Sequence, residues 1–296
     1  MRWRLILGPL MIVALAGVFY LDALAGRSAP LLLLLALAMG LRGTWELVDL
    51  LRVRSFEPQA GLVMLCTALV ILSNWYGRVW TTADAHVRDV GALGPALLVF
   101  ALAFLVLLMS EALRYQQPGR SMESLGAEVL AVAYVGILLS MTVQLRWVAG
   151  ADAGYFALGS LVVAAKSGDI GAYFLGKFFG RRKLIERLSP GKTRMGARGA
   201  IVGAALGSLV WFEWVAPLFN RDWPRCPWYW ALFFGAAIGV VGLMGDLCES
   251  LMKRDVGKKD SAPLLPSFGG LLDIIDSVIY AAPVAYVLWL VLPLGP

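Results

Sequence analysis

Nine long apolar stretches run along the chain, and they constrain its fold more than any other feature. A helix needs about 20 mostly apolar residues to cross the hydrocarbon core of a bilayer. The candidate spans are residues 5–25, 29–50, 60–75, 91–113, 125–145, 154–176, 199–219, 228–248 and 271–293. Because these runs are continuous rather than alternating, they do not fit a lipid-facing β-barrel. The sequence predicts an all-α, polytopic integral membrane protein with about nine transmembrane helices.

The composition excludes several other classes of protein. Hydrophobic residues make up 59% of the chain and charged residues 16%, whereas a soluble domain has roughly 45–50% apolar and about 25% charged residues. This excess of apolar residues rules out a soluble enzyme, a disordered chain and a disulfide scaffold. The three cysteines are not placed as a pair for an extracytoplasmic disulfide.

Lysine and arginine predict the orientation of the spans. With the N-terminus inside, most of the 26 basic residues fall in inner segments, as the positive-inside rule requires. The net charge of +6 then reflects topology and anionic lipids, and no nucleic acid is expected as a partner. We expect the bacterial inner membrane, with the N-terminus and the active site facing the cytoplasm. The first span also resembles a signal peptide, whose cleavage would leave the remaining topology unchanged.

Charged residues inside the spans collect in the second half of the chain. They are Lys166, Asp169, Asp246, Glu249, Asp273 and Asp276. Charge within a bilayer is costly and usually functional. The sequence therefore predicts two regions. Residues 1–150 form about five scaffold or lipid-facing spans, and residues 151–296 form a catalytic region of about four spans with two basic cytoplasmic loops.

The carboxylates suggest a metal site. Asp273 and Asp276 are three residues apart and share one face of a helix. Two carboxylates this close repel each other unless a cation lies between them. Mg²⁺ is typically bound by one or two carboxylates together with substrate phosphates, and Asp246 could supply a third ligand. The alternative is that these carboxylates form structural ion pairs with nearby lysines and arginines.

Two polar segments next to these spans have the chemistry of phosphate binding. The first, Ser250–Asp260, contains Lys253, Arg254 and Lys259, and it is followed by Gly269 and Gly270, where backbone can approach a ligand closely. The second, Ser189–Thr193, offers small hydroxyls, a glycine and the charge of Lys192. Taken alone, the first segment fits an ordinary positive-inside loop better, and the second lacks the spacing of a P-loop.

Together these segments resemble the signature of phosphatidate cytidylyltransferases, also called CDP-diacylglycerol synthases. That signature runs S-x-x-K-R-x4-K-D and then P-G-H-G-G-x-x-D-R-x-D-S. The matching residues are Gly245–Arg254, Lys259–Ser261, Leu265–Pro266, Gly269–Gly270, Leu272–Asp273 and Asp276–Ser277, with Gly168–Gly176 and Ser189–Thr193 upstream. The resemblance covers about residues 165–280, while the first half matches only as a run of helices. Ser267 and Phe268 replace the signature Gly and His, and Ile274 replaces its Arg.

The resemblance implies that CTP and phosphatidic acid react to give CDP-diacylglycerol and pyrophosphate, with membrane lipids and a homodimer as further expected partners. It implies Mg²⁺ as cofactor, with a second metal ion of unknown identity. The implied metal ligands are Asp246, Asp273 and Asp276. The implied catalytic residues are Lys253, Arg254 and Lys259, which act on phosphate charge and on the leaving pyrophosphate, and Asp260, which orients those cations or the metal shell. The implied substrate-binding residues are Asp169, Ser189, Lys192, Thr193, Ser250, Gly269 and Gly270.

Three other functions compete with this interpretation. One is a CTP-dependent lipid phosphotransferase of the polyprenol kinase type, which would share the basic loops. Another is a transporter, which would place its charges near the middle of the membrane and show repeat symmetry. The third is a catalytically weak paralogue that binds lipid, suggested by Phe268 and Ile274. Formation of a product that depends on CTP separates the enzyme from the last two.

Overall fold

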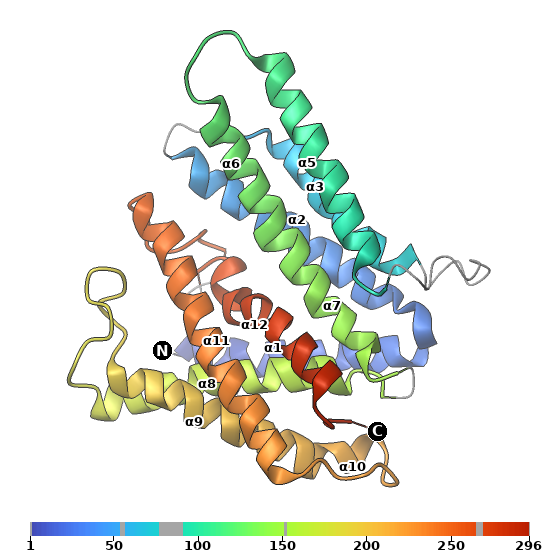
Figure 1. Ribbon diagram of the computed structural model, residues 1–296. Coiled ribbons are helices and arrows are strands. Elements are labelled where there is room, and N and C mark those ends of the chain that lie inside the picture. The colour runs from blue at the N-terminus through green and yellow to red at the C-terminus, as the bar shows by residue number, and fades with distance from the viewer. Residues whose placement is uncertain (1, 54–56, 77–90, 151–152, 265–268, 296) are drawn as a thin grey trace. The chain divides into compact units, whose positions relative to one another are not determined.

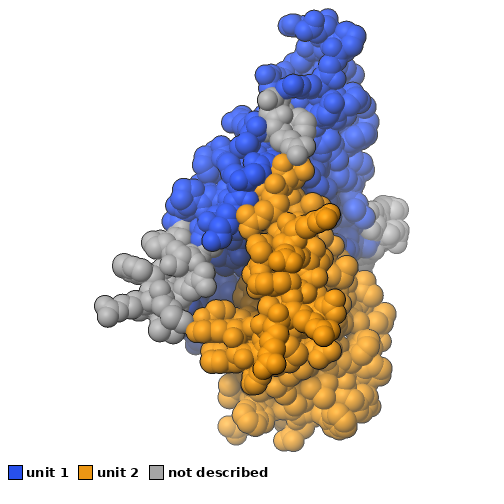
Figure 2. All heavy atoms as spheres, turned by 90° about the vertical axis from the view of Figure 1, so that its left-hand side faces the viewer, with its two compact units in different colours: residues 1–144, 256–274 blue, residues 145–255, 275–296 orange. Residues whose placement is uncertain are grey.

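The computed structural model describes residues 2–53, 57–76, 91–150, 153–264 and 269–295 (Figure 1). Within these ranges the named elements are all helices, and an isolated antiparallel bridge joins Lys183 and Thr193. The chain divides into two compact units (Figure 2). Unit 1 comprises residues 1–144 and 256–274, and unit 2 comprises residues 145–255 and 275–296. The functional division into residues 1–150 and 151–296 stays a prediction.

Six helical segments in the described part of the chain are long and apolar enough to cross a membrane. They are Gly26–Arg52, Gly94–Arg114, Ser121–Val148, Arg194–Phe219, Trp228–Asp255 and Leu272–Val291. Two shorter apolar helices are Gly8–Leu24 and Ala60–Trp75. The remaining predicted span, 154–176, coincides with a helix that carries Lys166, Asp169 and Lys177. The all-α polytopic class is therefore confirmed, and the count of nine spans stays a prediction.

Unit 1 is built from the helices of the first half of the chain. They are α1 (Arg2–Leu24), η1 (Gly26–Ser28), α2 (Pro30–Arg52), α3 (Ala60–Leu72), η2 (Ser73–Trp75), α5 (Gly94–Arg114), α6 (Ser121–Ala131), the π-helical η4 (Val132–Ile137) and the start of α7 (Leu138–Val148). Helix α3 packs against α2, α5 and η4. Small residues allow α2 and η4 to approach α3 closely. Gly40 of α2 faces Ile71 of α3, and Gly136 of η4 faces Val70 of α3.

Buried polar contacts tie the helices of unit 1 to one another. The Thr44 and Thr67 hydroxyls lie 3.2 Å apart across α2 and α3. The Asn74 amide donates to the Ser140 hydroxyl at 2.8 Å, and the Gln144 amide donates to Asn74 Oδ1 at 3.0 Å. A polar group in an apolar interior is costly unless it is hydrogen-bonded. These pairs therefore fix which helices are neighbours.

Unit 2 contains the remaining helices. They are the end of α7, α8 (Phe156–Phe179), α9 (Arg194–Val210), the π-helical η5 (Trp211–Val215), α10 (Ala216–Phe219), α11 (Trp228–Asp255) and α12 (Leu272–Val291), whose first three residues belong to unit 1. Helix α9 packs against both α8 and α11 (Figure 1). A Cβ added at Gly171 of α8 would collide with the Gly199 carbonyl of α9, and one at Gly239 of α11 would lie 2.7 Å from the Ala200 carbonyl. Small residues let helix backbones touch in this way, as is common in membrane bundles.

The three cysteines are free thiols, as the sequence predicts. Cys226 lies in the loop between α10 and α11 and is buried. Burial raises the pKa of its thiol to about 11, and the nearby Glu213 carboxylate adds to the rise. Because the thiolate is the reactive form of cysteine, this raised pKa keeps the Cys226 thiol protonated at neutral pH.

Candidate functional site

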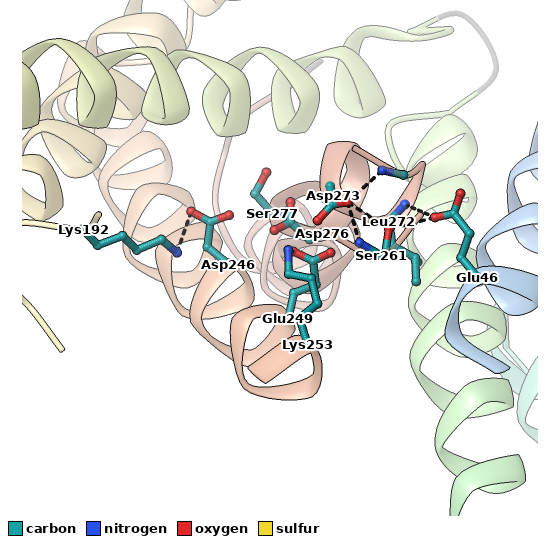
Figure 3. A network of polar contacts seen from close by, with 11 residues as sticks. Glu46, Lys192, Asp246, Glu249, Lys253, Ser261, Leu272, Asp273, Asp276 and Ser277 are labelled. Atoms are coloured by element: carbon teal, nitrogen blue, oxygen red, sulfur yellow. Dashed lines mark hydrogen bonds and ion pairs between the residues drawn. The ribbon is translucent and has the colours of Figure 1, made fainter. Parts of the chain in front are cut away.

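The loop before α9 holds Lys192 in a defined position. Its two arms pair: the Leu184 N–H donates to the Lys192 carbonyl at 3.0 Å, and the Arg194 N–H donates to the Arg182 carbonyl at 3.0 Å. The Lys192 ammonium lies 2.9 Å from Asp246 Oδ2 on α11 (Figure 3). The sequence assigned Lys192 and Asp246 to different roles, and the structure brings them together as an ion pair.

Thr193 has a structural role in this loop. It is buried, and its hydroxyl accepts from the Gly196 N–H at 3.0 Å, which makes it the N-cap of α9. The expected contact of Thr193 with substrate phosphate stays a prediction. The Ser189 carbonyl accepts from the Lys192 N–H at 3.1 Å, so Ser189 also helps to shape the turn.

Replacing this cap should loosen the loop that carries Lys192. Thr193→Ala removes the acceptor of the Gly196 N–H and should lower the free energy of unfolding by about 1 kcal/mol. Thr193→Ser keeps the oxygen and should stay close to wild type. Thermal unfolding in detergent measures both variants, and equal midpoints for the two would contradict the capping role.

The central feature of unit 2 is a pair of carboxylates, Asp246 of α11 and Asp276 of α12 (the carboxylate pair). Asp276 is only 2% exposed. The two groups are close enough to interact by hydrogen bonding as well as by like-charge repulsion. Asp276 Oδ1 also accepts from the Ser277 N–H at 2.6 Å. Two carboxylates at such close range, Asp276 buried and Asp246 half-buried, need a proton or a cation to offset their repulsion.

Lys166 of α8 supplies positive charge next to the carboxylate pair. Its ammonium lies 2.7 Å from Asp169 Oδ2 and donates to the Ser277 hydroxyl at 3.1 Å. The charge of Lys166 also acts on both carboxylates of the pair. Lys166 and Asp169 therefore form an ion pair within α8, and the hydrogen bond to Ser277 connects this pair to α12.

The last turn of α11 carries the basic residues of the signature. The Lys253 ammonium lies 2.6 Å from Glu249 Oε2, and both side chains are largely buried (Figure 3). Arg254 is exposed and Ser250 is half-buried on the same helix. Lys259 and Asp260 are exposed on the turn that follows α11, within unit 1. The catalytic roles of Lys253, Arg254, Lys259 and Asp260 stay predictions.

A second polar group lies in unit 1 and surrounds Asp273. Asp273 Oδ2 accepts from the Ser261 N–H at 2.9 Å, from the Ser261 hydroxyl at 2.9 Å and from the Gly270 N–H at 2.8 Å. Glu46 of α2 accepts from the Leu271 and Leu272 N–H groups at 3.0 Å each (Figure 3). We call Glu46, Ser261, Gly270–Leu272 and Asp273 the Glu46 network.

Two glycines make this network possible. Gly269 has a φ of +87°, and a Cβ there would collide with Asp273 Oδ2. A Cβ on Gly270 would collide with the Ser261 hydroxyl and with Glu46 Oε2. The sequence predicts that these glycines admit a substrate. In the structure they admit the protein's own carboxylates, and their contact with substrate stays a prediction. Leu265, Pro266, Ser267 and Phe268, which precede them in the signature, lie outside the described residues.

The metal-binding set proposed from the sequence falls on both units. Asp246 and Asp276 belong to unit 2 and Asp273 to unit 1. Across the described ranges, no cluster of three or more His, Cys, Asp and Glu side chains has the arrangement of a metal site. The carboxylate pair nevertheless fits Mg²⁺, which needs only one or two protein carboxylates when substrate phosphates and waters complete its coordination.

Sequence reasoning gave no site role to Glu46, Lys166 or Ser277. Glu46 interrupts an apolar run and has Arg42 four residues before it, a spacing that predicts the observed ion pair of 3.0 Å. The cost of charge in a membrane was the available signal for Glu46 and Lys166. Ser277 could be found only as the last residue of the signature.

Comparison with known proteins places the chain in a family. Residues 3–292 match the model of the cytidylyltransferase family. The chain belongs to the cytidylyltransferase family. A phosphatidate cytidylyltransferase of Synechocystis is 30% identical over 93% of this chain and 92% of its own length. Those of Pseudomonas aeruginosa and Bacillus subtilis are 33% and 29% identical, and the alignments cover 93% or more of each chain.

Membership of the cytidylyltransferase family confirms the resemblance found in the sequence and corrects its extent. The signature motifs lie in about residues 165–280, yet the family match also includes the N-terminal half of the chain. The buried polar residues of that half, Glu46 among them, are the positions where more specific requirements are expected.

Proposed function

We propose that this cytidylyltransferase transfers the cytidylyl group of CTP to phosphatidate, giving CDP-diacylglycerol and pyrophosphate. The observation that carries the proposal is the carboxylate pair of Asp246 and Asp276, flanked by Lys192 and Lys166 within unit 2. The carboxylates of this group can bind a metal ion, and its lysines can bind phosphate. A reaction between a metal-bound nucleotide and an anionic lipid requires both. The family membership and the printed names of the relatives support the same activity.

The two substrates are both anions, so cationic side chains are needed to bring them together. Lys192 is held at the end of a braced loop, and its ammonium can exchange its ion pair with Asp246 for a phosphate oxygen. Lys253, Arg254 and Lys259 add positive charge at and after the end of α11. Lysine serves as a point charge for phosphate, and arginine as a bidentate donor.

In this proposal Asp246 and Asp276 hold Mg²⁺. The ligand role of Asp273 and the second metal ion are proposed from the sequence alone. When bound, the metal neutralises phosphate charge and helps to align the reacting groups. The carboxylate pair itself supports this role, because its like-charge repulsion favours the binding of a cation.

The chemistry needs no general base from the protein. The second pKa of a phosphate monoester is about 6, so phosphatidate is mostly dianionic at neutral pH. One of its oxygens forms the new bond to the α-phosphorus of CTP, while the bond from that phosphorus to the bridging oxygen of the β-phosphate breaks. Pyrophosphate leaves with that electron pair. The side chains therefore contribute by positioning the two phosphates in line and by offsetting their charge.

The proposed setting is the bacterial inner membrane, with the N-terminus and the reacting groups on the cytoplasmic side. The bias of lysine and arginine toward the inner segments supports this orientation. The lipid tails would stay in the bilayer while the head group meets the basic loops. Association of two copies is part of the proposal only as a family-level expectation.

A reconstituted assay tests this function. Purified protein in vesicles containing phosphatidic acid should form CDP-diacylglycerol and pyrophosphate in equal amounts when CTP and Mg²⁺ are supplied. Asp246→Asn should lose the activity, whereas Asp222→Asn, in the exposed loop before α11, should keep it. Folded wild type that yields no product with either Mg²⁺ or Mn²⁺ would overturn the proposal. Phosphorylation of a polyprenol instead would favour the kinase alternative.

A further inference from the structure

Glu46 stands out among the buried charged residues of unit 1. It lies on α2, in the N-terminal half, and its side chain is fully buried. Its Oε1 accepts from the Leu271 N–H and from Arg42 Nε, and its Oε2 accepts from the Leu272 N–H, each at 3.0 Å. The Ser261 hydroxyl lies a further 3.0 Å from Oε2. Ser261 and Leu272, both labelled in Figure 3, are residues of the signature, and Leu271 lies between two of its matched positions.

These contacts place Glu46 at the N-terminus of α12. The first N–H groups of a helix have no partner inside the helix, and helices usually satisfy them with a local N-cap side chain. Here the cap comes from a helix more than 200 residues earlier in the chain. A carboxylate at this end is also stabilised by the helix dipole. A buried carboxylate is otherwise costly, so the contacts of Glu46 with the signature segment are what make its burial tolerable.

Glu46 is connected to Asp273 through a single residue. The Ser261 hydroxyl lies 3.0 Å from Glu46 Oε2 and 2.9 Å from Asp273 Oδ2. Asp273 Oδ2 also accepts from the Gly270 N–H, whose residue has no room for a side chain because of Ser261 and Glu46. The two carboxylates therefore hold the same short segment from two sides.

We propose that Glu46 is a positioning residue for the reaction. It fixes Ser261, Gly270 and the first residues of α12, and through them it sets the orientation of Asp273. This inference rests on the proposed function, and it assigns the N-terminal half a part in the chemistry beyond that of a scaffold. Outer residues that orient metal ligands typically change affinity or activity by about 10–100-fold when they are replaced.

Replacement by glutamine is a sharp test because both oxygens of Glu46 accept from backbone N–H groups. An amide has one oxygen, so Glu46→Gln must turn its NH₂ group toward either the Leu271 or the Leu272 N–H. The NH₂ group of the glutamine then faces a backbone N–H, so two hydrogen-bond donors oppose each other and that N–H loses its acceptor. The side chain keeps its size, so packing is not disturbed.

Glu128→Gln is the matched control. Glu128 is also a fully buried carboxylate of unit 1. Its Oε1 accepts from the Gln59 N–H at 2.8 Å, and its Oε2 has no hydrogen-bond partner among the described residues. Glutamine can keep the first contact and place its NH₂ group at the second position. The control therefore removes a buried charge without opposing two donors.

The experiment measures both variants in two ways. In hydrogen exchange, Glu46→Gln should speed the exchange of the Leu271 and Leu272 amides by about tenfold or more, because a buried N–H that loses its acceptor no longer holds this turn closed. In the phosphatidate assay it should lower kcat by about 10–100-fold and raise the Mg²⁺ concentration for half-activity, with KM for phosphatidate unchanged. Glu128→Gln should match wild type in both measurements after correction for folded protein.

The two readouts separate this inference from the proposed function. Faster local exchange in Glu46→Gln, with the activity loss confined to kcat and the Mg²⁺ requirement, supports positioning. Wild-type exchange at Leu271 and Leu272, or equal activity losses in Glu46→Gln and Glu128→Gln, would overturn it. If wild type forms no CDP-diacylglycerol, the proposed function fails, while the exchange result still reports whether Glu46 holds the segment.

Discussion

Asp276→Asn should lower kcat for CDP-diacylglycerol formation by about 10²–10³-fold, a loss of the size seen when one preorganised electrostatic contact of an active site is removed. Asparagine has the shape of aspartate but carries no charge. With one carboxylate of the pair neutralised, the remaining Asp246 has a weaker hold on a divalent cation and is still paired with Lys192. The positive charge of that cation, which would offset the negative charge of the nucleotide phosphates, is then lost from the site.

The same substitution should leave the protein at least as stable as wild type when no divalent cation is present. Asp276 is almost fully buried and is repelled by Asp246 and by Glu249. Removing its charge relieves that repulsion, and an amide can donate to Asp246. Activity and stability are therefore expected to move in opposite directions, as they do where a site is built for function at the expense of stability.

Thermal unfolding with and without Mg²⁺ provides a readout besides activity. A cation that binds only the folded state raises its stability, so wild type should show a higher midpoint in Mg²⁺, and Asp276→Asn should lose most of this rise. Asp222→Asn, which removes a carboxylate from an exposed loop of unit 2, should keep both the rise and the activity. Turnover by Asp276→Asn within about threefold of wild type would refute the assignment.

The sequence was sufficient for the fold class and for the helical segments, because both follow from local properties. Apolar runs of bilayer length predict helices wherever they occur, and the helices found begin and end close to the predicted spans. The pairing of Lys166 with Asp169 follows in the same way from spacing on one helix. The signature motifs added which carboxylates are expected to bind the metal, namely Asp246, Asp273 and Asp276.

The sequence was insufficient where a contact joins distant parts of the chain. Glu46 and Leu272 are 226 residues apart, and no periodicity predicts that a carboxylate of the second span caps the last helix. Gly270 illustrates the same limit. Its lack of a side chain correctly indicated a close approach, but whether a ligand or a protein group makes the approach depends on the tertiary fold.

The division of the metal set between the units has a similar cause. Helical spacing correctly places Asp273 and Asp276 on one helix, in its first two turns. It does not report that Asp273 Oδ2 already receives three hydrogen bonds from the preceding segment. The same spacing along a helix fits a carboxylate that binds a metal and one that accepts hydrogen bonds from the protein itself. Only the neighbouring groups in the fold distinguish these two roles.

Gly171→Ala should lower the stability of unit 2 strongly for a change of a single methyl group. In that unit α8 and α9 are in direct backbone contact at this position. The added Cβ would collide with the Gly199 carbonyl oxygen and lie 3.0 Å from Gly203 Cα. Backbone atoms cannot rotate away as a side chain does, so the two helices must separate. Overpacking of this kind costs about 1–3 kcal/mol, and we expect the upper part of that range.

Gly126→Ala is the matched control, because the same substitution there should have the opposite sign. Gly126 lies inside α6 with open space around its Cα, so alanine brings only its higher helix propensity, worth up to about 1 kcal/mol. Unfolding in detergent, followed by circular dichroism, compares the two variants directly. If Gly171→Ala is as stable as Gly126→Ala, then α8 and α9 do not meet backbone to backbone. Because α9 begins at the loop that holds Lys192, a wider helix pair should also weaken the ion pair of Lys192 with Asp246 and lower kcat along with stability.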